Sequence, residues 1–189
     1  MADITVFSHP VGNDMKAVLV FLLLASPVIA QNKLKDAAIA PGCGAANAKF
    51  EVTTDKRQRT VAQPEARKAL VYFIEDDSAF GSGLKPTTRA GVDGGWVGAT
   101  HGNSYFYFFL DPGEHHLCAS WQTAIALFQG RKTAAAHFTA EAGKVYYFRV
   151  KNIWHEHQGT ADIDFTPLDS DEGPLLVGKF SLSTFHPKN

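Results

Sequence analysis

The chain has 189 residues, of which 45% are hydrophobic and 20% are charged, and its 18 Lys and Arg residues nearly balance 19 Asp and Glu residues. This length fits one domain, and 14 Phe, 5 Tyr and 3 Trp residues supply enough apolar surface to exclude a disordered chain. A formal net charge of -1 gives no general reason to bind nucleic acid, and two cysteines are too few for a four-cysteine zinc site.

Residues 15–30 have the pattern of a secretory signal peptide. Lys16 supplies a positive charge, an apolar run follows it, and a small residue stands at the expected cleavage position. The run over 17–24 is shorter than the roughly 20 apolar residues that cross a bilayer. A buried helix of the mature fold is the other interpretation, and Pro27 disfavours it. The pattern predicts cleavage near Ala30 and delivery to the periplasm or the exterior, with no transmembrane segment in the mature protein.

Residues 1–14 are unusual in front of such a signal because they carry acidic residues and no Lys or Arg. Met15 followed by Lys16 has the pattern of a natural start. We therefore interpret residues 1–14 as an upstream extension, and residues 31–46, which are rich in Ala and Gly, as a flexible leader.

Cys43 and Cys118 are the two cysteines of the chain. Export would place them in an oxidising compartment, where two thiols more often form a disulfide than stay free. Such a bridge closes a loop of about 75 residues, which stabilises a fold by roughly 4 kcal/mol in the chain-entropy model. Two independent buried thiols are the alternative.

Short apolar or alternating segments, separated by turn residues, occupy residues 47–168. Residues 69–74 are apolar on both faces, which predicts a central strand, and residues 49–53 alternate, which predicts an edge strand. Asp93-Gly94 predicts a tight hairpin turn. The further expected strands are 88–92, 96–99, 104–110, 115–121, 132–139 and 145–151.

This succession of strands predicts an all-β fold, an antiparallel immunoglobulin-like β-sandwich. Ser170, Asp171 and Glu172 have the pattern of a helix start, with an N-cap and acids in the first turn. We therefore expect a short helix at about 170–181, and a C-terminal helix and tail over 169–189.

Histidines are candidate metal ligands. His155 and His157 have the spacing that places two imidazoles on one face of a strand. They could hold a divalent transition metal if His115 or His116 supplied a third ligand. Solvent-exposed loop histidines are the alternative. The candidate metal set is thus His115, His155 and His157, and no other cofactor is expected.

Aromatic residues are candidate partner-binding residues. Tyr105, Tyr107 and Phe109 share one face of the strand at 104–110, and the residues between them share the other. One set must pack between the sheets, and an exposed second set would suit a sugar ring or a partner protein. A helix or loop covering that second face is the alternative.

Hydrolytic chemistry has little support in the sequence. The Gly-x-Ser-x-Gly elbow is missing from it. A glycosidase needs two carboxyl groups at a set separation, and the pairs Asp76 with Asp77, and Asp162 with Asp164, could be recruited for this. Acids near Gly and Ser in loops are, however, ordinary solvated groups.

Five ordered segments carry a resemblance to a known family. They are residues 68–74, 91–98 (GVDGGWVG), 103–106 (NSYF), 112–119 (PGEHHLCA) and 142–149 (AGKVYYFR). Together they resemble a family of uncharacterised exported bacterial proteins known as a domain of unknown function, over about 68–151. More distantly, they are similar to the PEGA-like β-domains of the cell envelope. The resemblance implies an immunoglobulin-like sandwich at the envelope and brings no catalytic residue with it.

Two classes of function follow. The favoured one is an exported, non-catalytic envelope or secreted module that binds a protein or glycan through a strand edge or an aromatic face. The alternative is a metal-dependent or hydrolytic enzyme that uses the histidines.

Overall fold

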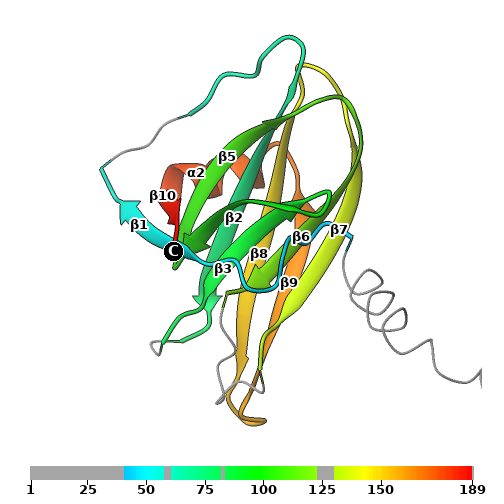
Figure 1. Cartoon of the computed structure of the whole chain (residues 1–189). Coiled ribbons are helices and arrows are strands. Elements are labelled where there is room, and N and C mark those ends of the chain that lie inside the picture. Colours follow the sequence, from blue (N-terminus) through cyan, green and yellow to red (C-terminus); the bar gives the residue numbers. More distant parts are fainter. Residues whose placement is uncertain (1–40, 58–60, 82–83, 123–129, 189) are drawn as a thin grey trace, which may run out of the picture. The chain divides into compact units, whose positions relative to one another are not determined.

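Two β-sheets of unequal size face each other in the structure, a computed structural model that describes residues 41–57, 61–81, 84–122 and 130–188 (Figure 1). The larger sheet has the strand order β1 (Phe50–Asp55), β10 (Ser181–Pro187), β5 (Ser104–Leu110), β2 (Ala69–Ala79), β8 (Val145–His155) and β9 (Thr160–Leu168). The smaller sheet has the order β4 (Gly95–His101), β3 (Thr87–Val92), β6 (Gly113–Trp121) and β7 (Thr133–Ala140). One helix of the described residues, α2 (Glu172–Lys179), precedes β10.

This arrangement confirms the predicted β-sandwich with a short C-terminal helix. The central place of β2, between β5 and β8, and the edge place of β1 follow the hydrophobic patterns of their residues. The Asp93-Gly94 turn joins β3 to β4, with φ of 50° at Asp93 and 86° at Gly94, as a tight hairpin requires. The immunoglobulin-like arrangement of strands stays a prediction.

The prediction of a wholly antiparallel arrangement is corrected. β2 pairs with β8 in parallel, and β10 pairs with β5 in parallel, so the larger sheet is mixed. Turn residues in a sequence indicate hairpins between consecutive strands, whereas β2 and β8 are separated in the chain by the whole of the smaller sheet. A connection that long permits parallel pairing.

The C-terminal tail is also corrected. Residues 181–187, expected to follow the helix as a tail, form β10, which lies between β1 and β5. β9, at the other edge, was not predicted either. The β-sandwich therefore extends beyond the expected limit at residue 168.

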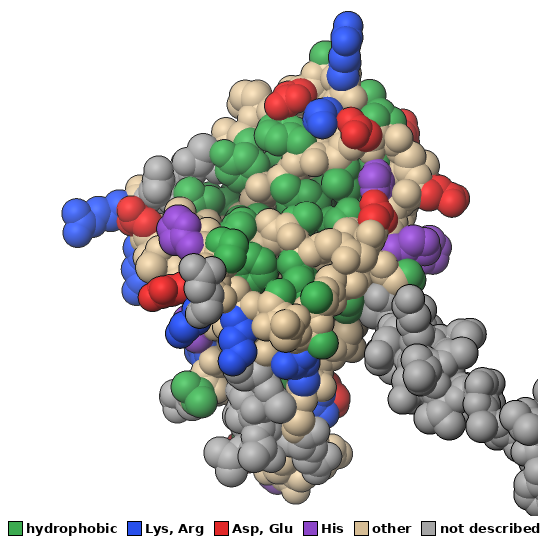
Figure 2. Space-filling view, in the orientation of Figure 1, with side chains coloured by type: hydrophobic (Ala, Val, Ile, Leu, Met, Phe, Trp, Pro, Cys, Tyr) green, Lys and Arg blue, Asp and Glu red, His purple; other side chains and the backbone are tan. Residues whose placement is uncertain are grey.

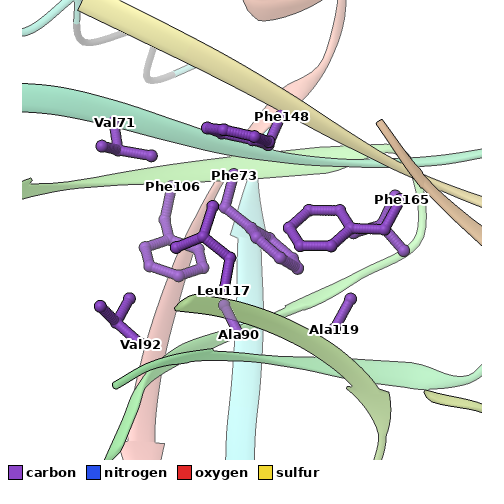
Figure 3. Close-up of a cluster of buried hydrophobic side chains, with 10 residues drawn as sticks. Val71, Phe73, Ala90, Val92, Phe106, Leu117, Ala119, Phe148 and Phe165 are labelled. Atoms are coloured by element: carbon purple, nitrogen blue, oxygen red, sulfur yellow. The ribbon is translucent and has the colours of Figure 1, made fainter. Parts of the chain in front are cut away.

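The apolar core fills the space between the two sheets. Alternate residues of β2 point into it, and Phe73 lies against Phe106 and Phe165, with ring centroids 5.6 Å apart in both pairs. Figure 3 shows these rings with Leu117 and Phe148 in one layer between the strands. Fully buried aromatic side chains of this size contribute much of the stability of a small domain.

The outer face of the larger sheet is covered by α2. Val177 of the helix and Phe180 after it pack with Leu70, Tyr72 and Tyr105 of the sheet. Gly173 lies so close to Tyr147 that a Cβ atom there would stand 2.3 Å from the ring. The helix thus rests on the sheet through a glycine contact. None of the described helical residues form a helix long and apolar enough to cross a membrane.

Residues 41–49, which we call the strap, cover part of the outer face of the smaller sheet. The disulfide Cys43–Cys118 confirms the predicted bridge and attaches the strap to β6. The buried Arg89 guanidinium donates to the carbonyls of Ala46 and Ala48 at 3.2 and 2.8 Å and lies 4.1 Å from the Trp96 ring. Residues 41–46, expected as part of a flexible leader, are therefore held on the sheet. Residues 1–40, including the predicted signal peptide, lie outside the described residues.

Candidate ligand-binding site

A pocket of about 490 Å³ lies where three distant segments of the chain meet: the end of β1, the β4–β5 turn and the junction of α2 with β10. Its lining consists of Thr54, Lys56, His101, Gly102, Asn103, Lys179, Phe180 and Ser181. Three of these side chains are basic, and none of the described residues in this lining is acidic. The volume is in the range of small-molecule sites.

Ser104 holds the β4–β5 turn in place beside β10. Its hydroxyl accepts a hydrogen bond from the His101 N–H at 3.3 Å and donates to the His101 carbonyl at 3.1 Å. The Ser183 hydroxyl of β10 donates to the Ser104 hydroxyl oxygen at 2.8 Å. Gly102 makes the turn possible because its φ of 72° lies in the left-handed region. One wall of the pocket is thereby fixed by hydrogen bonds.

The His101 imidazole is fixed through Nδ1, which lies 3.2 Å from the Pro86 carbonyl oxygen and 3.3 Å from the Thr87 hydroxyl. A carbonyl only accepts hydrogen bonds, so this contact assigns the proton to Nδ1. Nε2 is then the ring nitrogen that carries the lone pair.

The two lysines of the lining come from two distant segments of the chain. Lys56 directly follows β1, and Lys179 is the last residue of α2, with Nζ 5.8 Å from the centroid of the Phe180 ring. Phe180 is buried and its N–H donates to the Leu176 carbonyl at 2.9 Å, which fixes the chain between helix and β10. Two ammonium groups and an imidazole suit an anionic ligand.

A layer of buried polar side chains lies next to the pocket, at one end of the space between the sheets. Asn103 links the two, because its Oδ1 accepts a hydrogen bond from the Asp77 N–H at 2.8 Å. We call this layer the polar end; its members are Glu75, Asp77, Thr88, Thr100, Ser104, Asn152 and Ser183, all less than 10% exposed.

Asn152 organises the polar end. Its amide oxygen accepts from Trp121 Nε1 at 2.8 Å, so its Nδ2 group faces two carboxylates. Nδ2 donates to Glu75 Oε1 at 2.8 Å and to Asp77 Oδ1 at 2.6 Å. The Thr88 hydroxyl donates to Glu75 Oε1 at 2.7 Å. Within the described residues, Glu75 Oε2 and Asp77 Oδ2 have no hydrogen-bond partner.

Burial makes both carboxyl groups weaker acids than usual. It raises the pKa of Glu75 well above its ordinary value, and the nearby Asp77 charge raises it further, against the opposing hydrogen bonds from Thr88, Thr100 and Asn152. Burial also raises the pKa of Asp77, which Asn152 opposes by hydrogen bonding. Asp77, interpreted from the sequence as an ordinary solvated acid, is thus part of the interior.

The structure does not gather the predicted metal ligands. His115 lies on β6, where Nδ1 is 2.6 Å from Asp93 Oδ2; partial burial opposes its charge, but Asp93 raises its pKa above the ordinary value. His155 ends β8 with Nε2 at 3.1 Å from Asp162, and His157 follows in the β8–β9 turn. Among the described residues, no three His, Cys, Asp or Glu side chains are grouped as metal ligands. The proposed trio is therefore corrected, because the alternation that placed His155 and His157 on one strand ends at His155.

The predicted aromatic platform is largely covered. Tyr105 is fully buried beneath α2, so it is not available to a partner, and this part of the prediction is corrected. Tyr107 and Phe109 are half-buried and pack against the same cluster. The covering helix is the alternative that the sequence left open.

A comparison with protein families gives one match over residues 65–161, just over half of the chain, to a protein family of unknown function, DUF2846. The chain belongs to the DUF2846 family. The comparison with curated proteins finds no match.

The DUF2846 region runs from the residues before β2 into the start of β9. It contains Glu75, Asp77 and Asn152 of the polar end and the whole β4–β5 turn of the pocket. Lys56 and Lys179 lie outside it, directly after β1 and at the end of α2. The pocket therefore combines a turn of the DUF2846 region with cations from the flanking segments.

Sequence reasoning did not find this pocket. Thr54, His101 and Ser181 belong to strands that meet only because β10 inserts between β1 and β5, which no local pattern indicates. The available signal was chemical: two lysines beside predicted element ends, and a His-Gly-Asn turn at 101–103.

Proposed function

We propose that this chain is an exported, non-catalytic binding module of the cell envelope or the exterior, and that the pocket holds the acidic group of its ligand. The observation that carries the proposal is the convergence of Lys56, Lys179 and His101 on one pocket with no acid in its described lining. Ammonium groups around a concave site attract a carboxylate or phosphate.

Two features support export. Residues 15–30 have the charge and apolar pattern of a signal peptide, and the disulfide between Cys43 and Cys118 is of the kind that persists in oxidising compartments. The more distant sequence resemblance to the PEGA-like β-domains of the cell envelope is in line with this location.

Binding without catalysis is supported by the chemistry of the pocket. Its side chains offer ammonium, imidazole, amide and hydroxyl groups. The carboxyl groups nearest to it in the network, Asp77 and Glu75, are buried in the sandwich and held by Asn152. A glycosidase needs two carboxyl groups that reach its substrate. No observation favours the enzyme alternative, since His115, His155 and His157 are not brought together.

The pocket suits an anion, and a glycan is one of the expected partners. An acidic sugar meets both conditions. The test is an NMR titration of the mature chain with glucuronate, beside glucose as its neutral counterpart and inorganic phosphate as a small anion. We expect glucuronate to shift the amide signals of His101, Gly102 and Asn103, and glucose to leave them unchanged. A response to phosphate alone would assign the pocket to phosphorylated ligands instead of uronic acids.

Matched variants locate the binding. Lys56→Gln and Lys179→Gln should each weaken the anion response several-fold. Lys151→Gln, on β8 and outside the lining, should leave it unchanged. Equal affinity in all three variants, or equal responses to glucose and glucuronate, would contradict the proposal.

A further inference from the structure

Two histidines lie side by side on neighbouring strands of the smaller sheet. In the antiparallel pairing of β6 with β7, His116 is the direct partner of His137. Both side chains are exposed and lie on the outer face, since the neighbouring Leu117 and Phe138 point into the core. Both also line a hollow of about 210 Å³ beside Pro41.

The backbone hydrogen bonds show which kind of pair this is. The His116 N–H donates to Asp93 Oδ1 at 2.8 Å, and the His116 carbonyl accepts from the Asp93 N–H at 2.9 Å, so both groups point toward the β3 side. Successive residues of a strand direct their N–H and C=O groups alternately to the two neighbouring strands. Trp121, an odd number of residues after His116, donates its N–H to the Lys132 carbonyl on the β7 side at 3.0 Å. His116 and His137 therefore form a non-hydrogen-bonded pair.

Such pairs bring side chains closest together. Cα atoms in a non-hydrogen-bonded antiparallel pair are about 4.5 Å apart, and the Cβ atoms about 4.5–5.5 Å. Two imidazoles rising from that base on one face can both place a nitrogen at the roughly 2.0–2.1 Å that zinc requires. The sheet fixes both backbones, so little ordering is needed when an ion binds.

We propose that His116 and His137 form a binding site for a borderline divalent transition metal such as Zn²⁺ or Cu²⁺. The hydrogen bonds made by His116 in the described part of the chain use its backbone, which leaves the imidazole to ligate the ion. Two protein ligands leave the remaining coordination positions to water or to a ligand from outside the chain. This site is separate from the anion pocket, whose lining shares no residue with it.

Calorimetric titration of the mature chain with Zn²⁺ tests the site, with NMR to locate the ion. We expect one ion per chain and signal changes centred on His116 and His137. Binding should weaken as the pH falls, because a protonated imidazole cannot ligate, and Cu²⁺ should bind more tightly than Zn²⁺.

Single substitutions show whether the two rings act together. His116→Gln and His137→Gln should each weaken Zn²⁺ binding by at least about tenfold, since loss of even a supporting partner weakens metal sites by about 10–100-fold. The double variant should lose little more than either single one, because chelation needs both rings. His157→Gln, in the exposed β8–β9 turn, is the control and should bind Zn²⁺ like the natural chain.

Three results would overturn the inference: natural affinity in either single variant, equal loss in His157→Gln, or no Zn²⁺ binding by the natural chain. Unfolding curves without metal distinguish these from misfolding. Exposed substitutions usually change stability by no more than about 0.5 kcal/mol, so all variants should unfold like the natural chain.

Discussion

The two ends of the space between the sheets differ in chemistry, because one is apolar and the other holds buried polar side chains. At one end Phe73, Phe106 and Phe165 pack ring against ring (Figure 3). At the other end Glu75 and Asp77, the next two inward positions of the same strand β2, share the amide of Asn152. One strand thus changes from apolar to acidic residues while its burial stays complete.

The difference indicates what each end does. Apolar burial stabilises a sandwich without further conditions, whereas buried carboxyl groups lower its stability unless donors surround them. The polar end adjoins the pocket through Asn103. We infer that the apolar end supplies most of the stability, and that the polar end positions the turn that lines the pocket. Figure 2 shows hydrophobic side chains gathered over the middle of one face of the molecule, with charged side chains mostly toward its edges.

The largest expected effect lies at the apolar end. Phe73→Ala removes a ring that is 2% exposed and should lower the free energy of unfolding by about 3–5 kcal/mol, because the surrounding rings cannot fill the cavity. Urea unfolding measures it. Leu84→Ala, at a side chain that is 73% exposed, is the control and should change little. Similar losses in both variants would contradict the assigned core.

Asn152→Ala tests the polar end. It removes the amide donor of Glu75 and Asp77 and the acceptor of Trp121 Nε1, and should lower the free energy of unfolding by about 2–4 kcal/mol at neutral pH. The loss should shrink in acid, where protonated carboxyl groups need less support. Asn47→Ala, at an exposed asparagine, should have no comparable effect. A loss independent of pH would show that Asn152 acts through packing and its Trp121 hydrogen bond, and not through the two carboxyl groups.

The sequence predicts the apolar end of β2 but not its buried acidic end. The apolar run at 69–74 predicts a central strand, and β2 confirms it. The same pattern places the strand's end before Asp76, because three consecutive acids resemble a solvated loop. Only the neighbouring strands supply the donors that let Glu75 and Asp77 stay buried, and those strands lie up to 77 residues away.

The disulfide could be predicted from the sequence, whereas the histidine pair and the pocket could not. Two cysteines allow a single pairing, and the signal-peptide pattern predicts an oxidising compartment, so Cys43–Cys118 was predictable. His116 and His137 meet only through the register of β6 with β7, and the pocket forms only when β10 enters the larger sheet. Long-range pairing of this kind has no local signature in one sequence.

Glu75→Gln should raise the free energy of unfolding, whereas Phe73→Ala and Asn152→Ala should lower it. Its folded pKa lies above the ordinary value of 4.5, so folding takes up a proton between those values and the free energy of unfolding falls as the pH rises through that window. Gln keeps an acceptor for Thr88 and Asn152 without the charge. We expect a gain in the free energy of unfolding at neutral pH, and its size should reflect the pKa difference of Glu75 between the folded and unfolded states.

Unfolding curves of Glu75→Gln across the acidic and neutral range measure that gain. The difference from the natural chain should shrink as the pH falls and close below 4.5, where the natural carboxyl group is protonated in both the folded and the unfolded state. Glu141→Gln, at an exposed turn, is the matched control and should follow the natural chain throughout. Destabilisation at neutral pH would mean that the Glu75 charge has a counterion.

The smallest effect on stability, and the most informative for function, is expected at Asn103. Asn103→Ala removes the acceptor of the Asp77 N–H and should lower the free energy of unfolding by about 0.5–1.5 kcal/mol, the usual value of one hydrogen bond. Asn103→Asp keeps an oxygen for that N–H, so the turn stays in place, but it puts a negative charge into the pocket lining. If the polar end positions the turn and the pocket binds an anion, Ala should reduce stability and glucuronate affinity together, whereas Asp should reduce the affinity and largely spare the stability. NMR titration beside urea unfolding separates the two. Unchanged glucuronate affinity in Asn103→Asp would place the anion elsewhere, whatever the stability of the variant.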